Sequence, residues 1–229
     1  MLLQEAERRI RTTESQQRLT QLDGWWRNKR AKLNGKSVRV PAEEALSEAL
    51  WEEMEQVKED IILKIIPSDA SLSNLDTLQV SLETPRRKKK GIGKRSKPTD
   101  IRFYRTGSDI LDLRVEAKII LRDRDIPASY LSRDGLKRFS DPAEPYTDHE
   151  IGGMLAYTIS DDRESWLAKI DNALKAATPP IATFKHRVRA STDETLFCRI
   201  PYAAAITARN ELLVFHMVLE FDGDPNARA

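Results

Sequence analysis

The stretch TDIRFYRTGSDILDLRVEAKIIL, residues 99–121, decides the fold, because it has the pattern of two β-strands joined by a turn at Gly107. Such strands bury aliphatic side chains, yet the first opens with Asp100, and the second carries Glu116 and Lys118 within an apolar run. Residues two apart on a strand share a face, so Glu116 and Lys118 are expected to lie side by side. If the strands pair as a hairpin, Asp100 approaches Glu116 from the neighbouring strand.

These two carboxylates predict a site for a divalent metal ion. Brought together in a partly buried place, Asp100 and Glu116 repel each other, and a cation or a proton must offset the repulsion. Such oxygen ligands suit Mg²⁺ or Mn²⁺, which lower the pKa of a bound water and neutralise charge on a phosphate. Lys118 would stabilise the hydroxide or the pentacovalent transition state. The pattern therefore predicts hydrolysis of a phosphodiester. Asp112, another acid on the same strand, is interpreted as solvated.

The segments around this strand pair predict an α/β domain with a central mixed sheet. A strong helix is expected from Pro41 to about residue 66, with acids near its N-terminal end, and a second at 161–178. A weaker helical segment at 127–141 has a break near Gly135, and Gly152–Gly153 is interpreted as a turn. Strands or other apolar sheet segments are expected at 77–84, 154–160, 181–189, 195–206 and 211–221.

Positive charge is concentrated in one segment. The net charge of the 229 residues is only +2, but residues 86–97, RRKKKGIGKRSK, hold eight basic residues and no acid. The remaining 30 Lys and Arg are outnumbered by 36 Asp and Glu, which leaves a net charge of −6 elsewhere. Such a run is either a solvated loop or a contact for polyanions. We interpret it as a nucleic-acid contact made by Arg86, Arg87, Lys88, Lys89, Lys90, Lys94, Arg95 and Lys97.

With these residues, the chain resembles the PD-(D/E)xK nuclease superfamily, which has the restriction-endonuclease-like fold. The match is Thr99-Asp100 and then, 16 positions after Asp100, Glu116-Ala117-Lys118, with threonine replacing the usual proline. The resemblance implies a mixed sheet flanked by helices and a Mg²⁺- or Mn²⁺-dependent endonuclease. It also implies metal ligands at Asp100, Glu116 and the carbonyl of Ala117, and a catalytic role for Lys118.

A second part of the resemblance covers residues 135–162, GLKRFSDPAEPYTDHEIGGMLAYTISDD. This segment is similar to one in bacterial members of the superfamily, some of them linked to phage defence, which implies DNA as the substrate in a defence or DNA-processing system. Within it, Arg138 is either a helix-surface charge or a phosphate contact. The family often adds a glutamate from its first core helix to the metal site, and Glu44 and Glu48 are the candidates.

The expected organisation is an N-terminal helical extension at residues 1–40, a nuclease-like domain at 41–222 with the basic loop 85–98 inserted, and a tail at 223–229. The extension is expected to be helical to about residue 34, and the pair Trp25-Trp26 is interpreted as an anchor that docks against the main domain or, with the helix, against a protein partner. A homodimer is a further expectation, since two strands must often be cut.

The chain is expected in the cytoplasm and away from membranes, because no window approaches the ~20 apolar residues of a membrane span and the N-terminus lacks signal-peptide order. Cys198 is interpreted as a buried thiol, and His186 and His216 as core residues that could instead reach the back of the site. A different class of function also stays open: a non-catalytic nucleic-acid-binding or scaffold subunit that keeps the nuclease fold.

Overall fold

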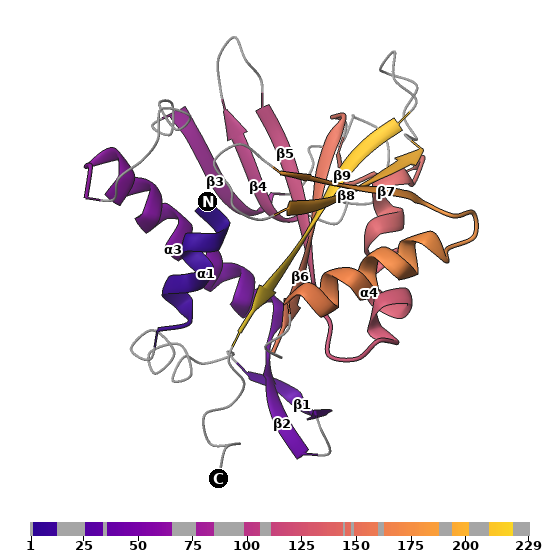
Figure 1. Cartoon of the computed structure of the whole chain (residues 1–229). Coiled ribbons are helices and arrows are strands. Elements are labelled where there is room, and N and C mark those ends of the chain that lie inside the picture. Colours follow the sequence, from indigo (N-terminus) through magenta and orange to yellow (C-terminus); the bar gives the residue numbers. More distant parts are fainter. Residues whose placement is uncertain are drawn as a thin grey trace.

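The computed structural model of the chain describes residues 2–12, 26–33, 36–65, 77–84, 99–105, 111–143, 145–147, 149–159, 163–187, 194–201 and 211–221. Within these residues, seven strands form one mixed sheet in the order β3-β4-β5-β6-β9-β8-β7 (Figure 1). Pairs β5–β6 and β6–β9 are parallel, and the outer pairs are antiparallel. The expected α/β class and mixed sheet are confirmed. The strands are β3 Leu78–Thr84, β4 Thr99–Arg105, β5 Leu111–Ile119, β6 Ile151–Thr158, β7 Ala182–Arg187, β8 Glu194–Pro201 and β9 Glu211–Glu220.

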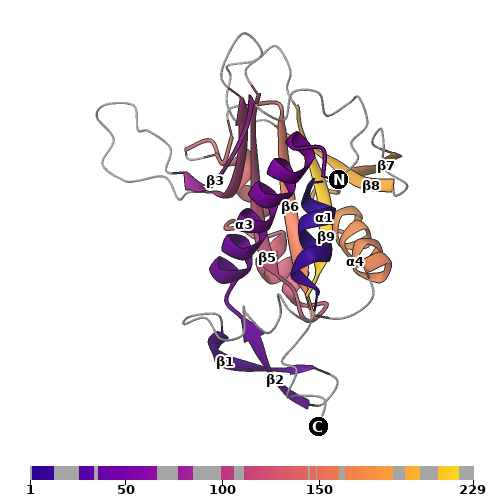
Figure 2. The same ribbon diagram turned by 90° about the vertical axis from the view of Figure 1, so that its left-hand side faces the viewer.

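Helices cover both faces of this sheet. One face packs against α1 and α3, and the other against α4 and two short helical turns, η3 and η4. In Figure 2, α3 and α4 lie on opposite sides of β6 and β9. Every helix in the described part is too short or too polar to span a lipid bilayer. The bounds are α1 Leu2–Ile10, α3 Glu43–Ile62, η3 Ile126–Tyr130, η4 Leu136–Ser140 and α4 Arg163–Lys175.

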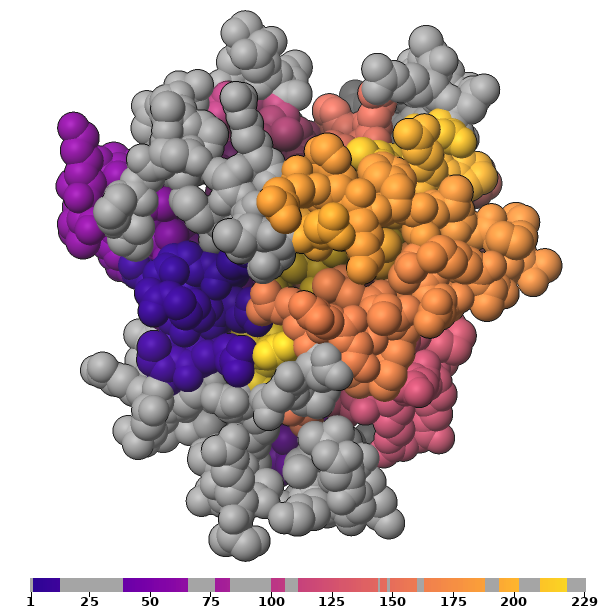
Figure 3. Space-filling view, in the orientation of Figure 1, coloured from indigo at the N-terminus to yellow at the C-terminus, as the bar shows by residue number. Residues whose placement is uncertain are grey.

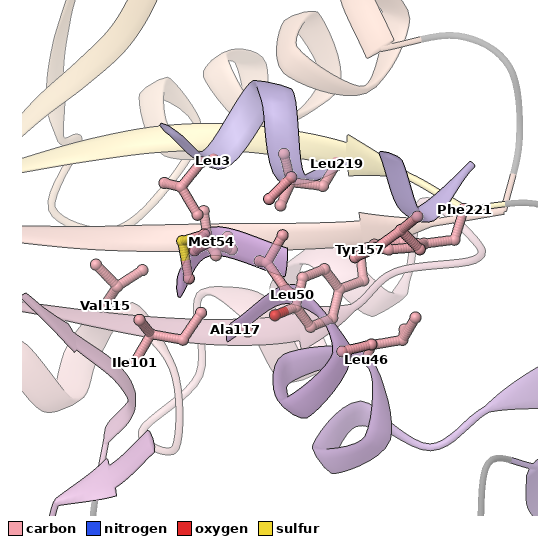
Figure 4. Packing of buried hydrophobic residues seen from close by; sticks show 14 of the residues in the cluster. Leu3, Leu46, Leu50, Met54, Ile101, Val115, Ala117, Tyr157, Leu219 and Phe221 are labelled. Carbon is pink, nitrogen blue, oxygen red and sulfur yellow. The ribbon is translucent and has the colours of Figure 1, made fainter. Parts of the chain in front are cut away.

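The alternation of β5 sends neighbouring side chains into two different environments. Val115 and Ala117 are fully buried in the core cluster beneath α3. Figure 4 shows Leu50 and Met54 of α3 on the same side of the sheet as these two residues. Glu116, between them, points to the other face. The apolar residues therefore fix the register, and the register determines where the carboxylate lies.

The N-terminal helix is part of the core, not an extension of it. In α1, Ala6 and Ile10 are fully buried against the sheet. The buried carboxylate of Glu7 accepts two hydrogen bonds from Nη2 of Arg163, both 2.7 Å long, and one from the backbone N–H of Glu220, 2.6 Å long. Burial raises the pKa of Glu7 even so. These contacts join α1 to α4 and β9, so the expected boundary at residue 40 does not separate α1 from the domain.

The prediction of a helix reaching residue 34 is wrong for residues 26–33. Residues Trp26–Leu33 form strand β1, which pairs antiparallel with β2, Lys36–Pro41. Because Leu33 pairs with Lys36, only two residues connect the strands. Those two are Asn34-Gly35, a dipeptide typical of tight hairpins, which the sequence interpretation took for the end of a helix. Trp25 and the side chain of Trp26 lie outside the described part, so their docking role stays a prediction.

The glycine pair 152–153 lies inside β6, so the expectation of a turn is wrong. A Cβ at Gly152 would overlap the ring of Phe139 on one face of the sheet. A Cβ at Gly153 would overlap the ring of Phe215 on the other face. Both positions need glycine because aromatic rings lie directly over the strand.

Replacing Gly153 with alanine is expected to destabilise the protein by about 1–3 kcal/mol, because the Phe215 ring has to move in a packed core. Urea unfolding followed by far-ultraviolet circular dichroism measures the change. The pair Gly153→Ala and Phe215→Leu should cost less together than the sum of the two single changes. An unaltered unfolding midpoint for Gly153→Ala would contradict the close approach.

Candidate active site

The candidate site lies where β4 and β5 separate. The paired ladder between these strands ends at Ile101. Beyond it, the N–H of Ala117 donates to Oδ2 of Asp100 over 2.7 Å, and the N–H of Ile119 donates to Oε2 of Glu43 over 3.0 Å. Two carboxylates thus replace the missing strand partner. The carbonyl of Ala117 faces the same gap, since the N–H and C=O of one residue point toward the same antiparallel neighbour.

The ammonium group of Lys118 links two carboxylates. Its Nζ lies 2.6 Å from Oε1 of Glu116 and 3.2 Å from Oε1 of Glu43. The three side chains are between 6% and 16% exposed, so solvent screens these charges only weakly. Burial by itself lowers the pKa of Lys118, but the negative charges of Glu116 and Glu43 outweigh it and raise the pKa above its usual range. The Lys118 side chain is therefore protonated at neutral pH, and its two ion pairs fix the position of the ammonium group.

The two acids predicted to meet do lie close enough to influence each other. Burial, followed by repulsion from Asp100, raises the pKa of Glu116 to about 8. Burial also raises the pKa of Asp100 to about 6, against the attraction of Lys118. Within the described part of the chain, Oε2 of Glu116 is buried with no hydrogen-bond partner. A buried carboxylate oxygen without a hydrogen-bond partner lowers the stability of the fold. Such an oxygen is typical of a site that binds an ion or another ligand.

Tyr146 and Arg138 form the wall beside Glu116. The Tyr146 hydroxyl donates to the carbonyl of Asp134 over 3.0 Å, and it also lies near enough to Glu116 to lower the pKa of that carboxyl. Burial and then the negative charge of Glu116 raise the pKa of Tyr146 above its usual range. The guanidinium of Arg138 is centred 6.0 Å from the Tyr146 ring and is buried, so Arg138 is not a helix-surface charge. Its contact with phosphate stays a prediction.

The helix glutamate of the site is Glu43, which the sequence analysis missed. Glu44 and Glu48, the two candidates, are exposed on α3. Positions three, four and seven apart share a helix face, so Glu43 lies on the same face as buried Leu46 and Leu50. The phase of the apolar stripe could have identified it, because only that face meets the sheet.

Other sequence interpretations have mixed outcomes. His216 is a satisfied core residue, with Nδ1 lying 3.0 Å from the Tyr130 hydroxyl and Nε2 lying 3.1 Å from Sγ of Cys198. Burial lowers the pKa of His216 to about 3 and raises that of Cys198 to about 12, so both are neutral. His186 is exposed on β7, not a core residue. Asp112 is not solvated but half-buried, with two hydrogen bonds from Arg102.

The residues that the structure brings together fit a divalent cation, with Asp100 and Glu116 as the two acidic ligands in the described part of the chain. No group of three or more His, Cys, Asp or Glu arranged to hold a metal occurs among the described residues. Mg²⁺ is nevertheless commonly held by one or two carboxylates together with waters and substrate phosphates. Oε2 of Glu116 is an orphaned acceptor, and the carbonyl of Ala117 and the carboxylate of Asp100 face the same gap.

The basic residues of segment 86–97 lie outside the described part of the chain, so their role stays a prediction. The described site contains one ammonium group and three carboxylates, from α3, β4 and β5.

Comparisons with protein-family models, with curated proteins and with solved structures found no match to this chain.

Proposed function

We propose that this chain is a Mg²⁺- or Mn²⁺-dependent nuclease of restriction-endonuclease-like architecture, with DNA as its substrate. The observation that carries the proposal is the orphaned Oε2 of Glu116 beside a second buried carboxylate, Asp100, and a lysine. A cation there satisfies the oxygen and removes the repulsion between the two acids. The order of α3, three antiparallel strands and then the parallel strand β6 is compatible with the proposed architecture.

Each residue has a separate task in the proposed reaction. Asp100, Glu116 and the Ala117 carbonyl would hold the cation. When bound, a divalent ion neutralises charge on the scissile phosphate and activates water. Lys118 presents a fixed ammonium to the charge that develops on the phosphate oxygens. Glu43 is a positioning residue, because it binds the Lys118 ammonium and the Ile119 N–H at the same time.

The proposal predicts cleavage that requires a divalent cation. Supercoiled plasmid and end-labelled oligonucleotides, single- and double-stranded, are incubated with Mg²⁺, Mn²⁺ or EDTA. Products are expected only with the metals, and Mn²⁺ should raise the thermal midpoint of the wild type but not of Asp100→Asn. Cleavage that persists in EDTA, or the absence of both cleavage and the metal-induced thermal shift, would contradict the proposal.

One observation favours a non-catalytic role as the second candidate. Lys118 already neutralises part of the charge on Glu116 and Glu43, so the cluster has an internal cation. A scaffold subunit that keeps the fold would need no metal ion to balance these carboxylates. Nucleic-acid binding without turnover, and with no thermal response to Mn²⁺, would support this role and exclude the nuclease.

A further inference from the structure

Two arginines lie opposite each other on the sheet, next to the candidate site. Arg102 of β4 pairs in register with Arg114 of β5, one alternation step from Asp100 and Glu116. Residues two apart on a strand share a face and are ~7 Å apart. Along this face the acid pair is therefore followed directly by an arginine pair.

Like charges directly opposite each other on a sheet destabilise it. Asp112 offsets part of this repulsion. Nε and Nη2 of Arg102 donate to its two oxygens over 2.7 and 2.9 Å, and Nη2 of Arg114 lies 3.4 Å from Oδ2. Nε2 of His149 is 3.7 Å from the same oxygen. Burial would raise the pKa of Asp112, but Arg102 and Arg114 outweigh it and lower the pKa. One carboxylate is therefore shared by three basic side chains.

Arg102 is held ready to bind a further anion. The Tyr104 ring lies beneath its guanidinium, with the centroid 4.7 Å from Cζ, and Asp112 fixes one edge of the fork. Nη1 of Arg102 makes no hydrogen bond within the residues that the structure describes. The Arg102 side chain is 24% exposed and Arg114 is 9% exposed. Arg102 is thus accessible to a ligand, while the buried Arg114 on the neighbouring strand adds positive charge beside it.

We propose that Arg102 binds the backbone phosphate next to the scissile one, with Arg114 as a positioning residue. The inference rests on the proposed nuclease function and deepens it. It makes the substrate a polynucleotide that runs along β4 and β5, not a small phosphate ester, because a second phosphate is recognised one step from the acids. A guanidinium with a preset fork is suited to phosphate oxygens.

The test measures binding in EDTA, where no cleavage occurs. A fluorescently labelled oligonucleotide is titrated at several salt concentrations. Arg102→Gln is expected to weaken binding by about tenfold and to reduce the salt slope by about one phosphate contact. Arg102→Lys, which keeps the charge but loses the fork, should keep the slope and lose less affinity. Arg199→Gln on β8, an exposed arginine paired with Glu211, is the matched control and should change neither.

Asp112→Asn separates a binding role from a structural one. The amide oxygen still accepts a hydrogen bond from Arg102, but the charge that competes with phosphate is gone, so affinity should rise severalfold. Wild-type affinity for Arg102→Gln in a folded protein, or weaker binding by a folded Asp112→Asn, would overturn the inference. An Arg102 effect on binding in a chain that cleaves nothing would instead leave the phosphate contact standing and remove the nuclease.

Discussion

Replacing Lys118 with methionine is expected to lower metal-dependent cleavage by about 10²–10³-fold, because a preorganised charge next to the scissile phosphate is lost. Methionine fills a similar volume without the ammonium. The Nζ atom contacts both Glu116 and Glu43, so no other cation of the described cluster takes its place. Single-turnover rates at saturating Mg²⁺ isolate the chemical step from binding.

The control for Lys118→Met is Lys169→Met on α4, since Lys169 is 41% exposed and its ammonium contacts an exposed Asp123 and the Trp166 ring, away from the site. It should cleave as the wild type does. Removing one partner of a buried ion pair costs several kcal/mol, so circular dichroism must show that Lys118→Met is folded. If it is not, Lys118→Gln, which keeps a hydrogen-bond donor for Glu116 and Glu43 but not the charge, takes its place. A folded Lys118→Met with wild-type rates would exclude the catalytic role.

Replacing Glu116 with glutamine is expected to abolish cleavage and, at high pH, to stabilise the metal-free protein by about 1–3 kcal/mol. The pKa of Glu116 is raised from 4.5 to about 8, and that of Asp100 from 3.8 to about 6. A carboxyl with a raised pKa keeps its proton longer in the folded state than in the unfolded chain. Its contribution to stability is complete below the unfolded pKa and is lost as the pH rises through the folded one.

In the metal-free wild type, the thermal midpoint should therefore fall between about pH 4.5 and 8, the interval set by Glu116. The Glu116→Gln variant should show a smaller fall, since the raised pKa values of Asp100 and Glu7 still contribute there but that of Glu116 does not. One kcal/mol corresponds to about 2–4 °C for a chain of this length. Saturating Mg²⁺ should flatten the wild-type profile, because a cation favours both charged forms. A wild-type midpoint that rises over this interval would contradict the buried, repelling pair.

The sequence was sufficient to predict the part of the site that follows from strand alternation. Asp100, Glu116 and Lys118 lie together because a period of two and a short hairpin leave few alternatives. Glu43 escaped prediction because the first six residues of α3 contain three glutamates. Only the packing of the helix against the sheet determines which of them faces the site. Arg102 was equally hidden, since its significance depends on which residue pairs with it across the strands.

The predictions for the β1–β2 hairpin and for the packing of α1 were wrong for different reasons. Residues 26–41 carry few apolar side chains, so their helical spacing was a weak signal, and the Asn34-Gly35 turn was the better one. The helix α1 was recognised as a helix, but its partner is distant in sequence. Local patterns cannot show that Glu7 meets Arg163 and Glu220.

The same contact restricts the order in which the chain can assemble during synthesis. The helix α1 packs against α3, but it also meets β9, more than 200 residues later in the sequence, as the hydrogen bond from Glu220 to Glu7 illustrates. Contacts this distant give a high contact order and slow folding. The contact of α1 with α3 can form early, whereas the buried carboxylate of Glu7 acquires its partners Arg163 and Glu220 only after α4 and β9 have been made, so the packing of this helix is completed late.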